Sequence, residues 1–242
     1  MLTKFFKNLI ISLFIAVFLL PSSVYAAIAF DARSANTVAD ADPVTFSHTT
    51  SGSNRFLIVA ISTVNDIVVG VTYNGVAMTQ SQKVTGITGS DPTNGVGYIY
   101  TLDNPASGTN DVSIDVSATG NNLRAAGISY NGVDALDASI AQVDAGTALS
   151  STVTVVADQS WVVFVATANG GGDITAGTNV TERGTGNGNL FLGDSNAVVS
   201  PGAFNQTATA DGTDNWMSGQ VSLSPFIDAP KGFGDIVLFG DW

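Results

Sequence analysis

Aspartate is the side chain of this sequence with the most capacity for chemistry. The 242 residues include twenty acids, of which only Glu182 is a glutamate, together with a single histidine, His48, and no cysteine. The stretches Asp40-Ala-Asp42 and Asp211-Gly-Thr-Asp214 place carboxylates two and three residues apart on expected loops, and Ca²⁺ prefers such oxygen ligands. Neither stretch completes a twelve-residue calcium loop. A structural calcium ion at these positions is therefore one hypothesis, and solvated turn acids are the other.

Catalysis has little support in these residue types. His48 lies in an alternating pattern, Thr45 to Thr50, typical of a strand, on the face of Phe46 or opposite it. A serine triad would place an activated serine and a carboxylate beside this histidine, and no nucleophile-elbow motif is present. Paired aspartates acting as in a glycoside hydrolase remain an alternative. We expect that the protein is not an enzyme, and a secreted hydrolase is the competing hypothesis.

An aromatic side chain follows the second acidic stretch. Trp216 comes directly after the loop that holds Asp211 and Asp214. An exposed ring beside a calcium-ordered loop could stack on a sugar, which makes a calcium-assisted carbohydrate-binding module, with a glycan as partner, an alternative function. A tryptophan packed under its own loop is the favoured interpretation, because tryptophan is mostly buried in folded proteins.

The C-terminal tail, residues 227–242, contains a second candidate interaction segment. Two prolines at 225 and 230 interrupt strand pairing, and the apolar run Ile236, Val237, Leu238 and Phe239 follows them. An unpaired apolar strand tends to seek a sheet edge. The tail therefore either completes the protein's own sandwich or pairs with a neighbour by strand addition, which would make the protein a self-assembling subunit. A sorting signal is a third option.

The N-terminus has the pattern of a cleaved signal-peptide helix, residues 1–26. Lys4 and Lys7 precede the apolar run Leu9 to Leu20, and small residues lead to a cleavage site after Ala26. A retained membrane anchor is the alternative. We expect a secreted protein, extracellular or at the cell surface, with no membrane contact after cleavage.

Charge limits the possible partners. Beyond residue 26 the chain keeps six basic residues against twenty acids. So negative a field repels nucleic acid and anionic lipid, which excludes nucleic acid as an expected partner.

The elements that must position these residues are all expected to be strands. Short β-branched and aromatic runs alternate with clusters of Gly, Asn, Asp and Ser, and the scarcity of glutamate argues against helices. The expected strands are 28–31, 44–49, 55–63, 67–73, 76–83, 95–102, 111–117, 123–130, 151–156, 160–168, 180–183, 190–193, 203–209 and 215–223. This spacing predicts an all-β fold, an antiparallel β-sandwich in one domain over residues 27–226.

Three runs indicate how strands lie in that sandwich. Residues 56–61 (FLIVAI) and 161–166 (WVVFVA) are apolar at every position, so we expect central strands that are covered on both faces, or strands with one face under a long loop. Residues 111–117 (DVSIDVS) alternate, which predicts Val112, Ile114 and Val116 inside and a wet outer face.

Two similar motifs raise the question of duplication. GVTYNGV occupies residues 70–76 and GISYNGV residues 127–133. In the first copy Asn74-Gly75 between two short strands predicts a two-residue hairpin. The second copy is followed by Asp134, Leu136 and Asp137, which we interpret as a loop. We expect each tyrosine to cap a strand end with its hydroxyl near water, and prefer two similar turns to a twin binding site.

With the motifs GSNRFLIV (52–59), VTYNGVAMT (71–79), NPASGTN (104–110) and GISYNGV (127–133), the chain resembles uncharacterised secreted β-sandwich proteins of environmental bacteria and phages. The resemblance covers residues 28–224 and implies a jelly-roll-like sandwich. It carries over no catalytic or binding residue. Taken together, the sequence predicts a non-catalytic extracellular protein that acts by binding or assembly, of the cell-surface, adhesion or fibre type.

Overall fold

The computed structural model describes residues 24–65, 67–87, 95–119, 123–168, 172–184 and 189–228. Every regular element in these ranges is a strand and every strand pairing is antiparallel, so the prediction of an all-β antiparallel fold is confirmed. Residues 26–226 form one compact unit. Outside it, the described residues form one short pair, β1 (Val24–Tyr25) with β20 (Ile227–Asp228). Within the described ranges no helix has the length and apolarity needed to span a membrane.

The N-terminal half of the compact unit is a sandwich of two sheets. We name them sheet 1, with strand order β4-β10-β6-β7, and sheet 2, with order β2-β11-β5-β9-β8 and β3 beside β11. The strands are β2 (Ala29–Arg33), β3 (Thr37–Ala39), β4 (Val44–Thr50), β5 (Phe56–Thr63), β6 (Val68–Tyr73), β7 (Val76–Ala77), β8 (Thr79–Thr85), β9 (Val96–Asp103), β10 (Gly108–Val116) and β11 (Leu123–Asn131).

The C-terminal half is a second sandwich. Its sheets are sheet 3, with order β12-β19-β14-β17-β16, and sheet 4, with order β13-β18-β15. The strands are β12 (Val133–Ala145), β13 (Ala148–Val155), β14 (Trp161–Thr167), β15 (Ile174–Ala176), β16 (Thr181–Glu182), β17 (Leu190–Asp194), β18 (Gly202–Ala210) and β19 (Asn215–Pro225). The sequence suggested one sandwich in residues 27–226, whereas the chain builds two.

The two sandwiches share one topology. In both, the chain alternates between the two sheets, so that β2-β11-β5-β9-β8 corresponds strand for strand to β12-β19-β14-β17-β16. In the same way β4-β10-β6 corresponds to β13-β18-β15. This alternation between paired antiparallel sheets is the jelly-roll arrangement that was expected. The protein is a tandem of two jelly rolls.

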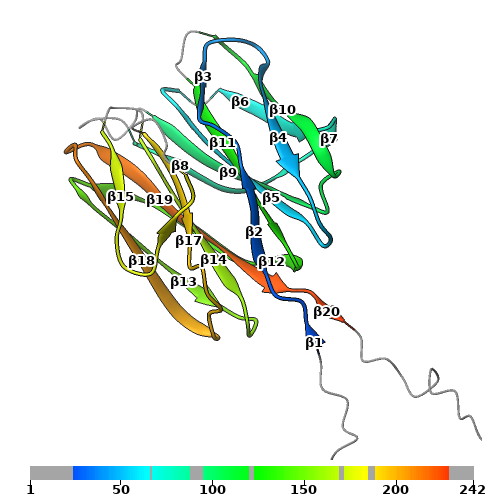
Figure 1. Ribbon diagram of the computed structural model, residues 1–242. Helices are drawn as coiled ribbons and strands as arrows, with labels where there is room; N and C mark the ends of the chain where they lie inside the picture. Colours follow the sequence, from blue (N-terminus) through cyan, green and yellow to red (C-terminus); the bar gives the residue numbers. More distant parts are fainter. Residues whose placement is uncertain are drawn as a thin grey trace, which may run out of the picture. The chain divides into compact units, whose positions relative to one another are not determined.

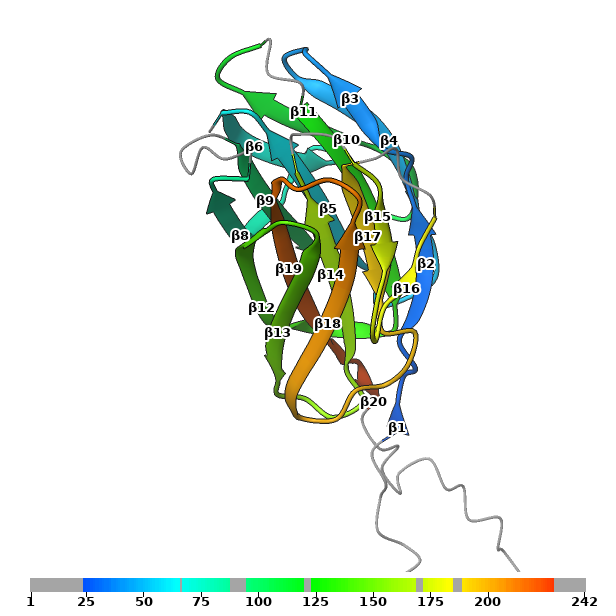
Figure 2. The same cartoon turned by 90° about the vertical axis from the view of Figure 1, so that its left-hand side faces the viewer.

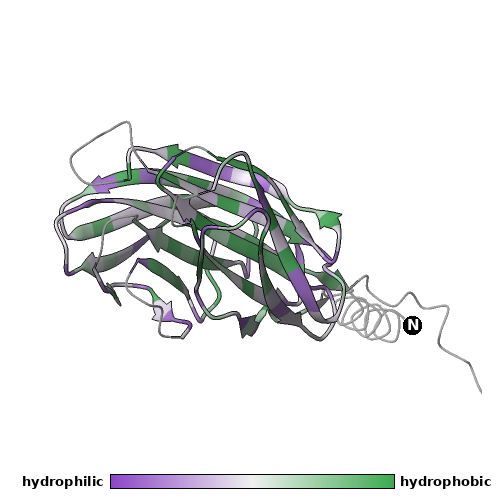
Figure 3. Ribbon diagram, turned by 90° about the horizontal axis from the view of Figure 1, so that it is seen from above, coloured by the Kyte–Doolittle hydropathy of each residue, from purple (hydrophilic) through white to green (hydrophobic). Residues whose placement is uncertain are grey.

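The sheets stack in four layers, with sheets 2 and 3 in the middle. One hydrophobic core lies between sheets 1 and 2, a second between sheets 2 and 3, and two smaller ones between sheets 3 and 4. In Figure 1 sheet 1 lies on one side of the stack and sheet 4 on the other, and in Figure 3 the strands in the middle of the view are coloured mostly as hydrophobic.

The two fully apolar runs lie where the sequence predicted them. On β5, Leu57 and Val59 face the core with sheet 1, while Ile58 faces sheet 3. On β14, Val163 and Phe164 face opposite cores in the same way. All eight residues of β5 are buried. The prediction that these strands are covered on both faces is confirmed, because each belongs to an inner layer of the stack.

Glycines allow sheets 2 and 3 to approach closely. A Cβ atom on Gly97 of β9 would lie 2.6 Å from Met217 Sδ, and one on Gly219 of β19 would lie 2.8 Å from Ile99 Cδ1. Each glycine thus accommodates a large side chain from the other sandwich. Because interiors are close-packed, these two positions fix the approach of the sandwiches.

The two YNG motifs each end a strand, but they form different connections and are not equivalent parts of a repeat. Asn74 and Gly75 both have positive φ and join β6 to β7, as a two-residue hairpin requires. In the second copy only Gly132 has positive φ. The first motif ends β6, whose counterpart is β15, whereas the second ends β11, whose counterpart is β19. The duplicated topology therefore does not explain the motif.

Two expectations about the second motif are wrong. The segment after Gly132 is no loop but β12, the longest described strand, which pairs with β19 along its length. Its polar residues lie where β12 forms the edge of sheet 3. The hydroxyl of Tyr130 does not face water either, because both Tyr73 and Tyr130 are fully buried and hydrogen-bonded.

Candidate functional site

The one histidine of the chain lies beside a serine and an aspartate. His48 on β4 is 2% exposed, on the same face as Phe46, and its Nε2 is 3.0 Å from Ser129 Oγ on β11. Ser129 Oγ donates a 2.9 Å hydrogen bond to Asp31 Oδ2 on β2. The fold thus brings together the three residue types of a serine triad, drawn from both sheets of the first sandwich.

The order of the hydrogen bonds does not suit a nucleophile. The single hydrogen of Ser129 goes to Asp31, so Ser129 Oγ accepts from His48 and Nε2 carries the ring hydrogen. In a serine triad the histidine instead takes the serine hydrogen. Burial lowers the pKa of His48 to about 4, although the charge of Asp31 opposes the shift. A neutral, buried histidine that donates to a buried serine pins sheet 1 to sheet 2.

A second polar cluster joins the two sandwiches. Asp194 on β17 is fully buried and accepts a 2.8 Å hydrogen bond from the hydroxyl of Tyr130 on β11. Arg183, which directly follows β16, donates to both oxygens of Asp194, with Nε 2.7 Å from Oδ2 and Nη2 2.8 Å from Oδ1. The backbone amide of Asn196 adds a fourth bond at 2.9 Å. Every charge in this cluster has a partner, as burial requires.

Aromatic rings surround the arginine of this cluster. The guanidinium of Arg183 lies 4.7 Å from the ring centre of Phe30 and 6.0 Å from that of Trp161. Burial lowers the pKa of Arg183, but the hydrogen bond and charge of Asp194 outweigh it and the net pKa is raised. Burial, and then the charge of Asp194, raises the pKa of Tyr130 well above its usual value. We call Phe30, Tyr130, Trp161, Arg183 and Asp194 the inter-sandwich latch.

The predicted sugar-stacking residue is inside the protein. Trp216 at the start of β19 is 0% exposed and belongs to the core between sheets 3 and 4. Asp211 and Asp214 lie in the turn before it, where their backbones bond to residues 173 and 146. The suggestion that Trp216 presents its ring at the surface is therefore wrong, and the favoured interpretation, a tryptophan packed beneath its loop, describes it.

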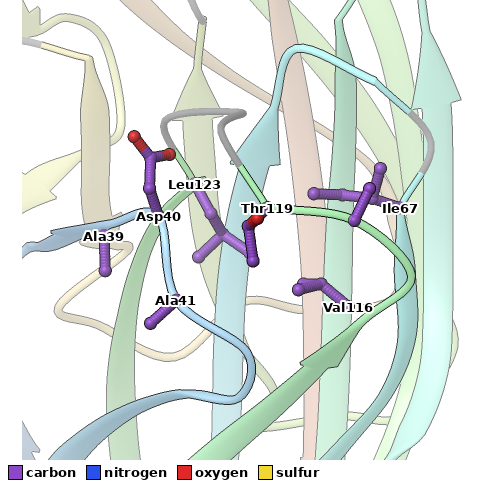
Figure 4. Close-up of a pocket in the computed structure, with 8 residues that line it drawn as sticks. Ala39, Asp40, Ala41, Ile67, Val116, Thr119 and Leu123 are labelled. Atoms are coloured by element: carbon purple, nitrogen blue, oxygen red, sulfur yellow. The ribbon is translucent and has the colours of Figure 1, made fainter.

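The first acidic stretch borders a small pocket. Asp40 lines it together with Thr119 and six alanine or aliphatic residues, and Figure 4 shows the Asp40 carboxylate at the rim beside Leu123 and Ala39. Asp42 instead accepts a 3.3 Å bond from the backbone amide of Val116. Nowhere in the described ranges do three His, Cys, Asp or Glu side chains gather as a metal would need. Calcium at either acidic stretch stays a prediction.

The predicted assembly segment, Ile236 to Phe239, lies outside the described residues. Neither polar cluster was anticipated as a site. Asp31 and Ser129 stand in ordinary strand contexts far from His48 in sequence, and no local motif marks them. The one available signal was that a lone histidine on an apolar strand face needs a polar partner.

No protein-family model matches the chain, and a search of curated proteins finds no match. Among solved structures, a similar chain is the major capsid protein P2 from bacteriophage PM2, at 9% sequence identity and a TM-score of 0.23, covering 85% of this chain and 100% of that one. A likeness this weak carries no argument about function.

Proposed function

We propose that the protein is a non-catalytic structural subunit that acts by binding or assembly outside the cell, as a cell-surface, adhesion or fibre-type protein. The observation that carries this proposal is the use of its buried polar groups. His48 and Ser129, 3.0 Å apart, connect sheets 1 and 2, and the fully buried Asp194 of the second cluster connects sheet 3 to sheet 2 through Tyr130.

The architecture supports a load-bearing role. Two jelly rolls are joined through a continuous apolar layer and the buried hydrogen bond from Tyr130 to Asp194 into a four-layered block. Such a block leaves the broad outer faces of sheets 1 and 4 open to partners. The signal-peptide pattern of residues 1–26 supports a place outside the cytoplasm.

Comparison of chain 27–242 with chain 27–226 by size-exclusion chromatography with light scattering tests this proposal. We expect the longer chain to form species larger than a monomer, because its apolar tail favours pairing with a sheet edge. Monomers from both chains at every concentration would contradict assembly through the tail.

A further inference from the structure

We infer that the outer face of sheet 4 is a contact surface for a second copy of this chain; the inference rests on the proposed function. The face consists of alternate residues of three strands, which point away from the core with sheet 3. They are Ala148, Ser150, Thr152 and Thr154 of β13, Ala203, Asn205, Thr207 and Thr209 of β18, and Thr175 of β15. We call them the sheet 4 face.

The sheet 4 face differs from the rest of the protein in charge. None of these residues is ionisable, in a chain whose formal charge is −12. The topologically equivalent outer face of sheet 1 carries Asp111 and Asp115, both exposed on β10. Like charges that meet across an interface cost several kcal/mol, so two copies approach more easily through a face that has none. The outward rows of sheet 4 offer such a face, although Asp144 and Asp137 of β12 border it through bonds to the backbone amides of Ser150 and Val156, and the outward row of β10 in sheet 1 does not.

Polar side chains of the sheet 4 face already form hydrogen bonds within the protein. The side-chain amide of Asn205 donates to Ser150 Oγ and to Thr152 Oγ1, each at 2.9 Å. The hydroxyl of Thr207 accepts a 2.8 Å bond from the backbone amide of Thr178. These polar atoms already have partners within the protein. A partner that covers the face therefore leaves fewer polar groups without a hydrogen bond when water is displaced.

Apolar exposure extends the same face. Val156 follows β13 in register with the outward row of Thr152 and Thr154 and is 67% exposed. In Figure 2 β13 and β18 lie in front of β14 and β19, which places the face toward the viewer. A second copy that packs on it would bury this valine together with the methyl groups of the threonines.

The size of the face sets the strength of the contact. The strands β13 and β18 are about 26 to 30 Å long, β15 is about 10 Å long, and neighbouring strands lie about 4.8 Å apart, so the face offers about 300 Å² for each partner. A stable dimer usually needs about 800 Å² from each partner. The sheet 4 face therefore supports a weak contact, of the kind that an assembly multiplies, and association should be visible only at high protein concentration.

Sedimentation velocity of chain 27–242 from about 10 µM to about 1 mM tests the inference. We expect Thr154→Glu/Thr209→Glu to weaken the association at least about tenfold, because both sites are exposed and would place like charges in the contact. The matched control, Thr45→Glu/Thr109→Glu on sheet 1, should associate like the unmodified chain. If the first variant does not melt cooperatively, the single exposed change Ala203→Glu replaces it.

Single cysteines give an independent readout because the chain has none of its own. Under mild oxidation, Thr152→Cys on the sheet 4 face should form disulfide-linked dimers at least about tenfold faster than Thr45→Cys on sheet 1. Association of the sheet 4 glutamate variant at full strength, or equal cross-linking of the two cysteine variants, overturns the inference alone. An unmodified chain that stays monomeric throughout overturns the proposed function as well.

Discussion

Tyr130 of the first jelly roll donates a 2.8 Å hydrogen bond to Asp194 of the second, and both side chains are fully buried. Asp194 also holds Arg183 through two charge-assisted bonds. The latch therefore crosses the contact between the sandwiches at a point where no water can replace a lost partner.

Removal of the carboxylate should destabilise the protein strongly. We expect Asp194→Ala to lower the free energy of unfolding by about 3 to 5 kcal/mol, because it leaves Arg183 charged and poorly exposed without its partner. Tyr130→Phe should cost about 1.5 kcal/mol, since Arg183 still neutralises Asp194. Urea denaturation measures both changes.

Asp111→Ala is the control for the latch. Asp111 accepts one exposed hydrogen bond from Ser47, so its loss should change stability by no more than about 0.5 kcal/mol. Equal effects of Asp111→Ala and Asp194→Ala would show that the latch does not stabilise the block.

Alanine at the close-approach glycines should force the sandwiches apart. Gly97→Ala and Gly219→Ala should each cost about 1 to 3 kcal/mol through overpacking, with Gly219 the more sensitive because the carbonyl of Ile140 lies 3.2 Å from the added Cβ. Gly70→Ala is the matched control, since a Cβ there meets nothing within 4 Å. Thermal melting compares the three variants. The close approach of sheets 2 and 3 is refuted if all three melt alike.

Acid should weaken the fold through His48. Its folded pKa, about 4, lies below the unfolded value of 6.5, so the unfolded state binds more protons between these values. The stability that a neutral His48 supplies is complete above pH 6.5 and is lost as the pH falls toward 4. Between pH 7.5 and 4.5 this amounts to about 2.5 kcal/mol.

His48→Gln removes that titration and isolates its effect from those of the carboxylates. The variant should lose about 2.5 kcal/mol less than the unmodified protein over the same pH range, as measured by urea denaturation at each pH. Parallel pH profiles for the two proteins would rule out a depressed pKa for His48.

Trp216 should matter for stability and not for sugar binding. Trp216→Ala should cost about 3 to 5 kcal/mol, because it empties a fully buried core position. The milder Trp216→Phe should leave the fold intact and, on a glycan array with calcium and with chelator, give the same signals as the unmodified protein. A calcium-dependent signal that Trp216→Phe abolishes would restore the carbohydrate-binding hypothesis.

Local patterns in the sequence predicted the features of the fold that neighbouring residues determine, such as buried strands and a hairpin turn. The runs from Phe56 and Trp161 are apolar at every position because inner layers have no wet face. Asn74-Gly75 specified its hairpin through positive φ. The longest described strand, β12, was interpreted as a loop because of its polar residues. An edge strand beside solvent tolerates such residues.

The tandem arrangement could not be predicted in the same way. It depends on which strands pair, and residues such as Tyr130 and Asp194 are 64 positions apart without any motif that links them. The burial of the Trp216 ring likewise depends on which residues pack over its loop, and no local pattern in the sequence shows this. Both polar clusters are long-range consequences of the sheet order.

The molar mass of the protein recovered from the medium of cells that express all 242 residues tests whether the chain is a secreted, self-assembling subunit. We expect a secreted chain that begins at Ala27 and forms particles whose masses are multiples of the mass of the mature chain, and we expect deletion of residues 227–242 to dissociate these particles. A chain retained in the cytoplasm, or a secreted monomer at every concentration, would contradict this expectation.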